Sequence, residues 1–559
     1  MKKVFIGFAV LVVLIVAAAV SIPFWFDVNQ FRPRIEAELS NALGREVKIG
    51  ELKLSILEGD VSASGITIAE DSAFQKSTSG PFVSAKSLGI GVDMRQLVME
   101  RKLLIRGITI DAPEIQLIQT AAGQWNFSSI GGSKPAGAPP PASSSTSDLA
   151  STLSVQSVKI SNGRVSLVRP GERPLALGAL KVEVKDVSPN NAIPFDLAAN
   201  LETSPLALAG TIGPLNREDA SLTPVKAKLK LSQVDVFKYG FVNASTPFRG
   251  IIGVDGSLET DGRNATVQGA LRGERLVLAK RGSPAGRPVE IDFSVKHDRI
   301  KRSGVLEHAA ISIGAAKANL AGSYQLSPLG DAAASTLHMK LQAPGMQLNE
   351  LVAMLPALDV VLPNGSKLQG GTLALNLAFD GSADKLAYQG TIKAEKTRLV
   401  GFDLGSKMKT VASLAGIKLA PDTDITVAGA AVKGDPASTK IDNIEIAAAG
   451  IGELIGAGTI SAANELNFQM RANLHTGGAV LSMIGIRGDA GIPFKIQGTS
   501  SDPKFIPQIK DMAVERLKKL TPDDISRTVD KFKKGGAPSA DEIGNTAGQI
   551  LDLFRKKKQ

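Results

Sequence analysis

Side chains able to bind a metal or to move protons are few and scattered in this 559-residue chain, which contains no cysteine. Its four histidines are His297, His308, His338 and His475. None of them has a second ligand at the short spacing that zinc sites use. We therefore interpret the histidines as structural or surface residues, and we expect no metal and no cofactor.

Sequence motifs for nucleophilic catalysis and for nucleotide binding are missing as well. No Gly-x-Ser-x-Gly or His-Glu-x-x-His segment occurs. The glycine-rich stretch 401–407 lacks the lysine that follows the second glycine of a phosphate-binding loop, and Gly450-Ile451-Gly452 lacks the rest of a dinucleotide-binding motif. The sequence therefore predicts a protein that is not an enzyme.

The first residues have a physical pattern with a definite meaning. Lys2 and Lys3 precede an apolar run over residues 4–22. As a helix this run would be roughly 28 Å long, which is close to the ~30 Å hydrocarbon core of a bilayer. Trp25 and Phe26 follow, where aromatic side chains lie at the membrane–water interface. This pattern indicates a segment that enters a membrane.

Two interpretations of this segment remain open. One is an uncleaved transmembrane anchor over residues 1–26, and the other is a signal peptide cleaved after the small residues Ala19-Val20-Ser21. We predict the anchor, because the apolar run is longer than the roughly 7–15 residues of a signal peptide. The two lysines then place the N-terminus in the cytoplasm and the bulk of the chain outside it. An exported chain without cysteine must be stable without disulfides.

From Leu153 to about Pro503, apolar and polar residues alternate with a period of two, which predicts strands with one apolar and one polar face. Asp255-Gly256, Asp261-Gly262, Asn364-Gly365 and Asp380-Gly381 are predicted to be turns between such strands. Ten side chains in three clear stretches are predicted to form the apolar face: Ile291, Phe293, Val295, Leu373, Leu375, Leu377, Phe379, Leu466, Phe468 and Met470.

The alternation predicts a long antiparallel meander, and its apolar face must be covered. It could be covered by a second sheet in a β-sandwich, or the sheet could curl into a groove that holds an apolar ligand. The pattern alone leaves both arrangements open. The fold class that we predict is mainly β, with an N-terminal transmembrane helix, an elongated curled antiparallel sheet, a few helical inserts and amphipathic helices at the C-terminus.

Helical periodicity occurs at only a few places. Residues 29–43 repeat apolar side chains every four positions, Met346–Leu358 is leucine-rich, and 405–414 is a weaker candidate. In the tail after residue 508, one stripe could cap the last strand, dock a partner protein or contact a membrane, and it consists of Ile543, Ile550, Leu551 and Phe554. The predicted organisation is an anchor (1–26), an N-terminal module (27–130), a disordered Gly/Pro/Ser linker (131–150), a β-rich body (151–343), a C-terminal β region (344–508) and a helical tail (509–559).

The charge distribution indicates which partners to expect. The net charge is +10, and residues 504–559 contribute 13 basic against 8 acidic residues. Such a basic end is attracted to anionic lipid surfaces. No basic patch is interleaved with aromatic residues, so we expect no nucleic acid partner.

Four segments resemble the AsmA family. In Asp27–Ala69 an anchor leads into a helix, a Leu-Gly-Arg turn and strands, and Gly107–Phe127 ends in a Gly-x-x-Asn-aromatic motif. Leu399–Lys409 and Gly491–Pro507 are similar to segments of the C-terminal region of that family. The aromatic residue of the motif, Phe127, stands where the family often has tryptophan.

This resemblance implies an inner-membrane-anchored protein whose body lies in the periplasm of a bacterial envelope. It implies a groove in which membrane phospholipid passes along the ten apolar residues named above, in support of outer-membrane biogenesis. The alternative is a scaffold or assembly factor for outer-membrane proteins that does not transport lipid. In that case, envelope proteins would bind through the C-terminal helices.

Overall fold

The computed structural model describes residues 28–508, except for 56–58, 76–79, 94, 97–103, 121–123, 131–154, 170–173, 189, 215, 217–221, 240–241, 243–246, 328–334, 383–384, 403–422, 450–451 and 475–490. The predicted anchor, linker, helix at 405–414 and tail helices lie outside the described residues. Within them, no helix is both long enough and apolar enough to cross a bilayer.

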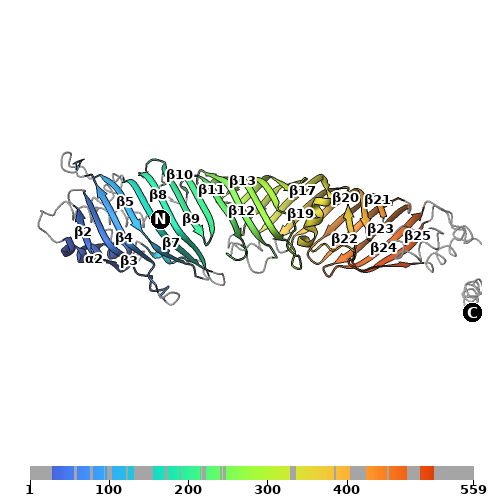
Figure 1. Cartoon of the computed structure of the whole chain (residues 1–559), viewed down its shortest axis with the longest axis horizontal. Helices are drawn as coiled ribbons and strands as arrows, with labels where there is room; N and C mark the ends of the chain where they lie inside the picture. The colour runs from blue at the N-terminus through green and yellow to red at the C-terminus, as the bar shows by residue number, and fades with distance from the viewer. Residues whose placement is uncertain are drawn as a thin grey trace, which may run out of the picture.

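The described strands form one sheet of 26 strands (Figure 1). Those of its first half are β1 (Val47–Ile49), β2 (Leu52–Ser55), β3 (Asp60–Ile68), β4 (Val83–Val92), β5 (Ile105–Asp111), β6 (Glu114–Ile118), β7 (Val155–Val168), β8 (Leu175–Val187), β9 (Ile193–Leu201), β10 (Ser204–Ile212), β11 (Val225–Asp235), β12 (Arg249–Thr260) and β13 (Asn264–Val277).

Those of its second half are β14 (Val289–Asp298), β15 (Ser303–Ile313), β16 (Ala316–Gln325), β17 (Thr336–Gln347), β18 (Lys367–Gln369), β19 (Thr372–Ser382), β20 (Ala387–Val400), β21 (Thr423–Gly434), β22 (Ser438–Ala448), β23 (Gly452–Ser461), β24 (Glu465–Leu474), β25 (Ile492–Thr499) and β26 (Pro503–Pro507). The alternating sequence pattern therefore correctly predicted a mainly β chain.

Neighbouring strands pair antiparallel along the described sheet, apart from one position. There β7 pairs parallel with both β5 and β6. Parallel neighbours need a connection that returns to the starting end of the strand, and residues 119–154, which include the Gly/Pro/Ser stretch, make this connection. The strands before and after this stretch consequently belong to the same sheet.

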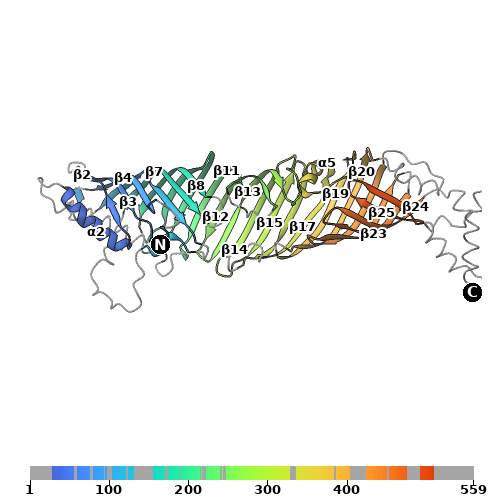
Figure 2. The same ribbon diagram turned by 90° about the horizontal axis from the view of Figure 1, so that it is seen from below.

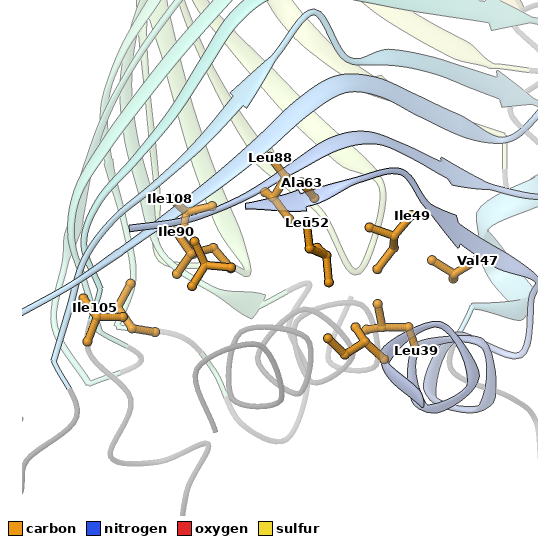
Figure 3. Packing of buried hydrophobic residues seen from close by; sticks show 12 residues of the cluster. Leu39, Val47, Ile49, Leu52, Ala63, Leu88, Ile90, Ile105 and Ile108 are labelled. Carbon is orange, nitrogen blue, oxygen red and sulfur yellow. The ribbon is translucent and has the colours of Figure 1, made fainter. Parts of the chain in front are cut away.

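The sheet is elongated and curled. Figure 1 shows the strands lying obliquely to the long axis, from β2 at one end to β25 at the other, and Figure 2 shows the same body turned by 90°. Seen from close by in Figure 3, the first strands arch over helix α2. A single curled sheet, rather than two stacked sheets, is therefore the architecture of the described residues.

Helices are few among the described residues, as the sequence predicted. The named helices there are η1 (Val28–Phe31), α2 (Arg32–Leu43), η2 (Asn126–Ser129), α5 (Leu348–Leu351) and η4 (Val352–Leu358). Gly44 follows α2 with φ 67°, a left-handed conformation that favours glycine and ends the helix. The predicted helix over 346–358 begins two residues late, because Met346 and Gln347 still pair with β19 as part of β17.

Two of the four predicted turns were wrong. Asp261-Gly262 and Asn364-Gly365 do form turns, but Asp255-Gly256 lies inside β12 and Asp380-Gly381 inside β19. Gly256 faces Gly269 across β12 and β13, and a Cβ at Gly256 would lie 2.8 Å from the carbonyl oxygen of Gln268. Glycine there permits a close approach of two backbones, a need that local turn statistics do not detect.

Candidate functional site

The register of the sheet places one continuous row of side chains on a single face. Cross-strand partners point to the same side of a sheet, so the row can be followed from strand to strand. From β3 to β20 it consists of Val61, Ile90, Ile108, Val158, Val184, Phe195, Gly210, Ala227, Leu258, Val267, Val295, Leu306, Gly322, Met339, Phe379 and Tyr388. The row contains no charged side chain.

A second row continues the same face to the last strand. It consists of Leu341, Leu377, Gly390, Val432, Ile441, Gly458, Phe468, Ile496 and Phe505. The ten residues predicted from alternation all lie on this face, while Asp292, Asn376 and Gln469 are exposed on the other face. We call the first the apolar face and the second the polar face.

At the N-terminal end, the apolar face is filled. In Figure 3 the labelled side chains of β1 to β5 point into the curl, on the side of Leu39 of α2. Leu39, Leu52, Ile90 and Ile108 are buried in this cluster. Helix α2 therefore closes this end of the curled sheet, because its apolar side packs against the first strands.

The C-terminal end is filled too, which corrects the status of two predicted residues. Phe468 and Met470 are only 8% and 5% exposed and pack in a cluster with Ile492 and Phe494. Alternation had placed both on an accessible lining. The burial of these two side chains could not be predicted from the sequence, because it depends on how distant strands curl together.

Between these two ends the apolar face remains partly exposed. Leu229, Val267, Phe293 and Val295 are neither buried nor part of any of the three buried clusters. A stretch of uncharged, partly accessible apolar surface therefore runs along the middle of the sheet. We call this stretch the groove.

The helical segment α5–η4, which we call the insert, covers part of the apolar face. Its residues Leu351 and Met354 are buried together with Val289, Ile313 and Ala343 of the sheet. Three predicted lining residues pack against this cluster, namely Ile291, Leu373 and Leu375. The insert thus narrows the groove between β13 and β19 without covering Phe293 or Val295.

The strands end at two rims of the sheet. One, which we call the insert rim, carries residues 278–288 and 348–366, and the opposite rim carries the turns 261–263, 299–302, 462–464 and 500–502. The insert also connects these two rims. Arg281 forms an ion pair with Asp359 at 3.1 Å and donates a hydrogen bond to the carbonyl oxygen of Ala462. The amide of Asn364 donates to the carbonyl of Ser501 at 2.8 Å. The curl therefore brings the opposite rim of β23–β26 to the insert rim.

The histidines and other candidate chemical groups do not converge. His297 Nδ1 lies 3.1 Å from the hydroxyl of Tyr324, and His338 Nδ1 lies 3.1 Å from a carboxylate oxygen of Asp380. His308 is exposed, and His475 is outside the described residues. In the part of the chain that the structure describes, no three metal-ligating side chains lie close enough to hold an ion.

Two motifs from the sequence meet in one buried polar cluster. Asn126, fully buried, accepts a hydrogen bond from the amide of Ile118 and donates to Glu70 at 2.8 Å. Arg45, from the Leu-Gly-Arg turn, pairs with Glu70 at 3.4 Å and donates to the carbonyl oxygen of Asn126. Its guanidinium lies 4.8 Å from the centre of the Phe82 ring. Burial lowers the pKa of Arg45, and the nearby carboxylate of Glu70 opposes this.

These contacts give the motifs a structural role, because they fasten the turn after α2 to the hairpin that follows β6. An Asn126→Ala change is expected to destabilise this end by about 3 kcal/mol, since buried partners lose their hydrogen bonds. Hydrogen exchange of β6 and urea unfolding would measure the loss. Asn200→Ala, at an exposed strand position, is the control. Equal stability of both variants would contradict the role.

Comparison with known proteins gives this geometry a family. The sequence model of the AsmA family matches residues 1–469. The chain belongs to the AsmA family. The matched range of this AsmA family protein includes Arg45, Asn126 and the whole groove, whereas the resemblance at Gly491–Pro507 lies beyond it. No curated protein and no solved structure matches the chain.

Proposed function

We propose that this AsmA family protein passes phospholipid along the apolar face of its sheet. The observation that carries the proposal is the continuous, uncharged row from β3 to β20, partly exposed in its middle. Acyl chains would lie on this row, and headgroups would remain in water at a rim. Family membership supports a role in lipid transfer or envelope biogenesis.

The proposed mechanism is partition rather than catalysis. Each CH₂ group removed from water contributes about 0.8 kcal/mol. An acyl chain would therefore be held by the apolar area that it buries, and not by a specific pocket. Rows of similar side chains on successive strands give it equivalent positions along the sheet. The protein would need neither a cofactor nor a covalent intermediate, and we propose that it is not an enzyme.

The cellular placement is part of the same proposal. Residues 1–26 would anchor the chain in the bacterial inner membrane with a cytoplasmic N-terminus, and the sheet would lie in the periplasm. The helices η1 and α2 come between this segment and the first strand, so the strands would begin close to the membrane that supplies the lipid. Passage along the sheet would then serve assembly of the outer membrane.

A second candidate function is supported by an exposed apolar patch on the insert rim. Leu358, Val360 and Val361 are 48%, 46% and 42% exposed, and the amide of the neighbouring Leu278 binds the carbonyl of Ala357. Exposed apolar patches on a soluble body often contact proteins. A scaffold or assembly factor for outer-membrane proteins would use this patch, and lipid would then not enter the groove.

Site-specific photo-crosslinking in the full chain tests lipid passage. A benzophenone amino acid at Phe293, which faces the groove, is expected to capture phospholipid in cells. The same group at Asp292, exposed on the polar face of the same strand, should capture none. Mass spectrometry of the adducts provides the measurement. Capture of protein alone at Phe293 would rule out passage and favour the scaffold.

A further inference from the structure

The opposite rim has basic residues concentrated in two adjacent turns, 261–263 and 299–302, which we call the cationic turns. They contact each other, because the amide of Arg299 donates to the carbonyl oxygen of Arg263 at 2.9 Å. An Arg299 guanidinium N–H also donates to the carbonyl of Gly262 at 2.7 Å. The basic residues of the two turns are Arg263, Arg299, Lys301 and Arg302. Other described turns of this rim without lysine or arginine are 435–437, 462–464 and 500–502.

The two nearby carboxylates accept hydrogen bonds from the backbone, and Asp298 also forms an ion pair at 3.9 Å with Lys301, whose side chain is exposed. Asp261 accepts hydrogen bonds from the amides of Asn264 and Arg263, and Asp298 accepts from those of Lys301 and Ile300. These bonds lower the pKa of both carboxyl groups, which therefore stay ionised. Four cations against two anions leave the cationic turns with a net positive charge.

Polar groups of the groove lie directly beside these turns. His297 and Tyr324 are both cross-strand partners of Gly304, so they lie side by side on the apolar face at the end nearest the cationic turns. Their rings stack with centroids 5.8 Å apart. The Nε atom of Arg302 is buried and has no hydrogen-bond partner. Val295 is two residues from His297, so the apolar surface begins about 7 Å further in. From the rim into the groove, the chain therefore presents first cations, then the polar rings of His297 and Tyr324, and then hydrocarbon.

We infer that the cationic turns hold the net-anionic headgroup of a phospholipid whose acyl chains lie in the groove on the row of Val295. This inference rests on the proposed function and adds headgroup selectivity to it. Arg263 and Lys301 would contact the headgroup through exposed side chains, while His297 and Tyr324 would lie at the level of the glycerol and ester groups. An anionic lipid would dwell here longer than a zwitterionic lipid with the same chains.

The test uses the full chain in a neutral detergent, with a benzophenone amino acid at Val295. Two probes with identical acyl chains are compared, phosphatidylglycerol (net charge −1) and phosphatidylcholine (net charge zero). In the double variant Arg263→Gln/Lys301→Gln, capture of phosphatidylglycerol is expected to fall about tenfold or more at low salt. Capture of phosphatidylcholine should change less than about twofold. The matched control is Lys228→Gln/Lys230→Gln on the polar face of β11, where both lysines are exposed.

The outcomes separate the two proposals. If the chain with benzophenone at Val295 and unchanged cationic turns captures neither lipid, lipid passage itself is wrong. If both lipids are captured and the double variant captures them equally well, the groove binds lipid and the headgroup inference is wrong. An equal loss of both lipids in the double variant, or a loss in the β11 control, would likewise overturn charge recognition at this rim.

Discussion

A Val267→Asp chain is expected to fold and to lose most of its lipid transfer. Val267 lies in the middle of the uncharged row, between Leu258 and Val295, and is partly exposed. A carboxylate there can stay hydrated while the groove is empty, so the cost to stability is small. An acyl chain that slides past would remove that water without supplying a partner, and leaving a charge unpaired in hydrocarbon costs several kcal/mol.

Transfer of a fluorescent phospholipid from proteoliposomes that contain the full chain to acceptor vesicles would measure the effect. We expect the rate to fall at least about tenfold. Gln268→Asp is the matched control, because Gln268 is the next residue of the same strand and is exposed on the polar face. Both variants gain the same charge. Equal transfer by the two would show that lipid does not use the apolar face.

The choice of Val267 depends on the structure. Leu375 shows the same alternation in the sequence, but it packs against the cluster beneath the insert. A carboxylate at Leu375 would displace that packing, and loss of transfer would then not distinguish a blocked groove from a misfolded insert. Phe468 has the same drawback, because it is buried in the C-terminal cluster.

The sequence predicted those features that local pattern controls. A period of two specifies which residues share a face, so the sequence correctly predicts that the ten apolar residues of the three stretches lie on one side of the sheet. The end of the first helix at residue 43, before the Leu-Gly-Arg turn, and Asp261-Gly262 as a turn follow from backbone preferences of single residues. Each of these predictions needs only a few neighbouring positions.

Features set by distant parts of the chain could not be predicted in the same way. The burial of Phe468 depends on the curl of the last strands, and the contact of Arg281 with Ala462 joins residues 181 positions apart. Asp255-Gly256 has the composition of a turn, yet it lies in β12 because β11 and β13 pair with it on both sides. The partners of Asn126 come from three separate segments, so its motif did not reveal a structural role.

Whether the middle of the sheet is open or filled can be decided by one pair of substitutions. Phe494 and Phe293 are both phenylalanines in strands, on the same face of the same sheet. Phe494 is fully buried in the C-terminal cluster, whereas Phe293 is partly exposed in the groove. Phe494→Ala is expected to cost about 3–5 kcal/mol, because a large cavity forms in a packed cluster.

Phe293→Ala should cost only about 1 kcal/mol, because less apolar area leaves contact with protein and water or lipid can fill the space. Hydrogen exchange of the flanking strands, β24 with β25 and β13 with β14, would measure each local loss. Losses of equal size would mean that the middle of the sheet is packed like its ends, and that no groove exists. The expected difference would show that the apolar surface in the middle of the sheet is not covered by other parts of the protein. A sliding acyl chain requires this arrangement.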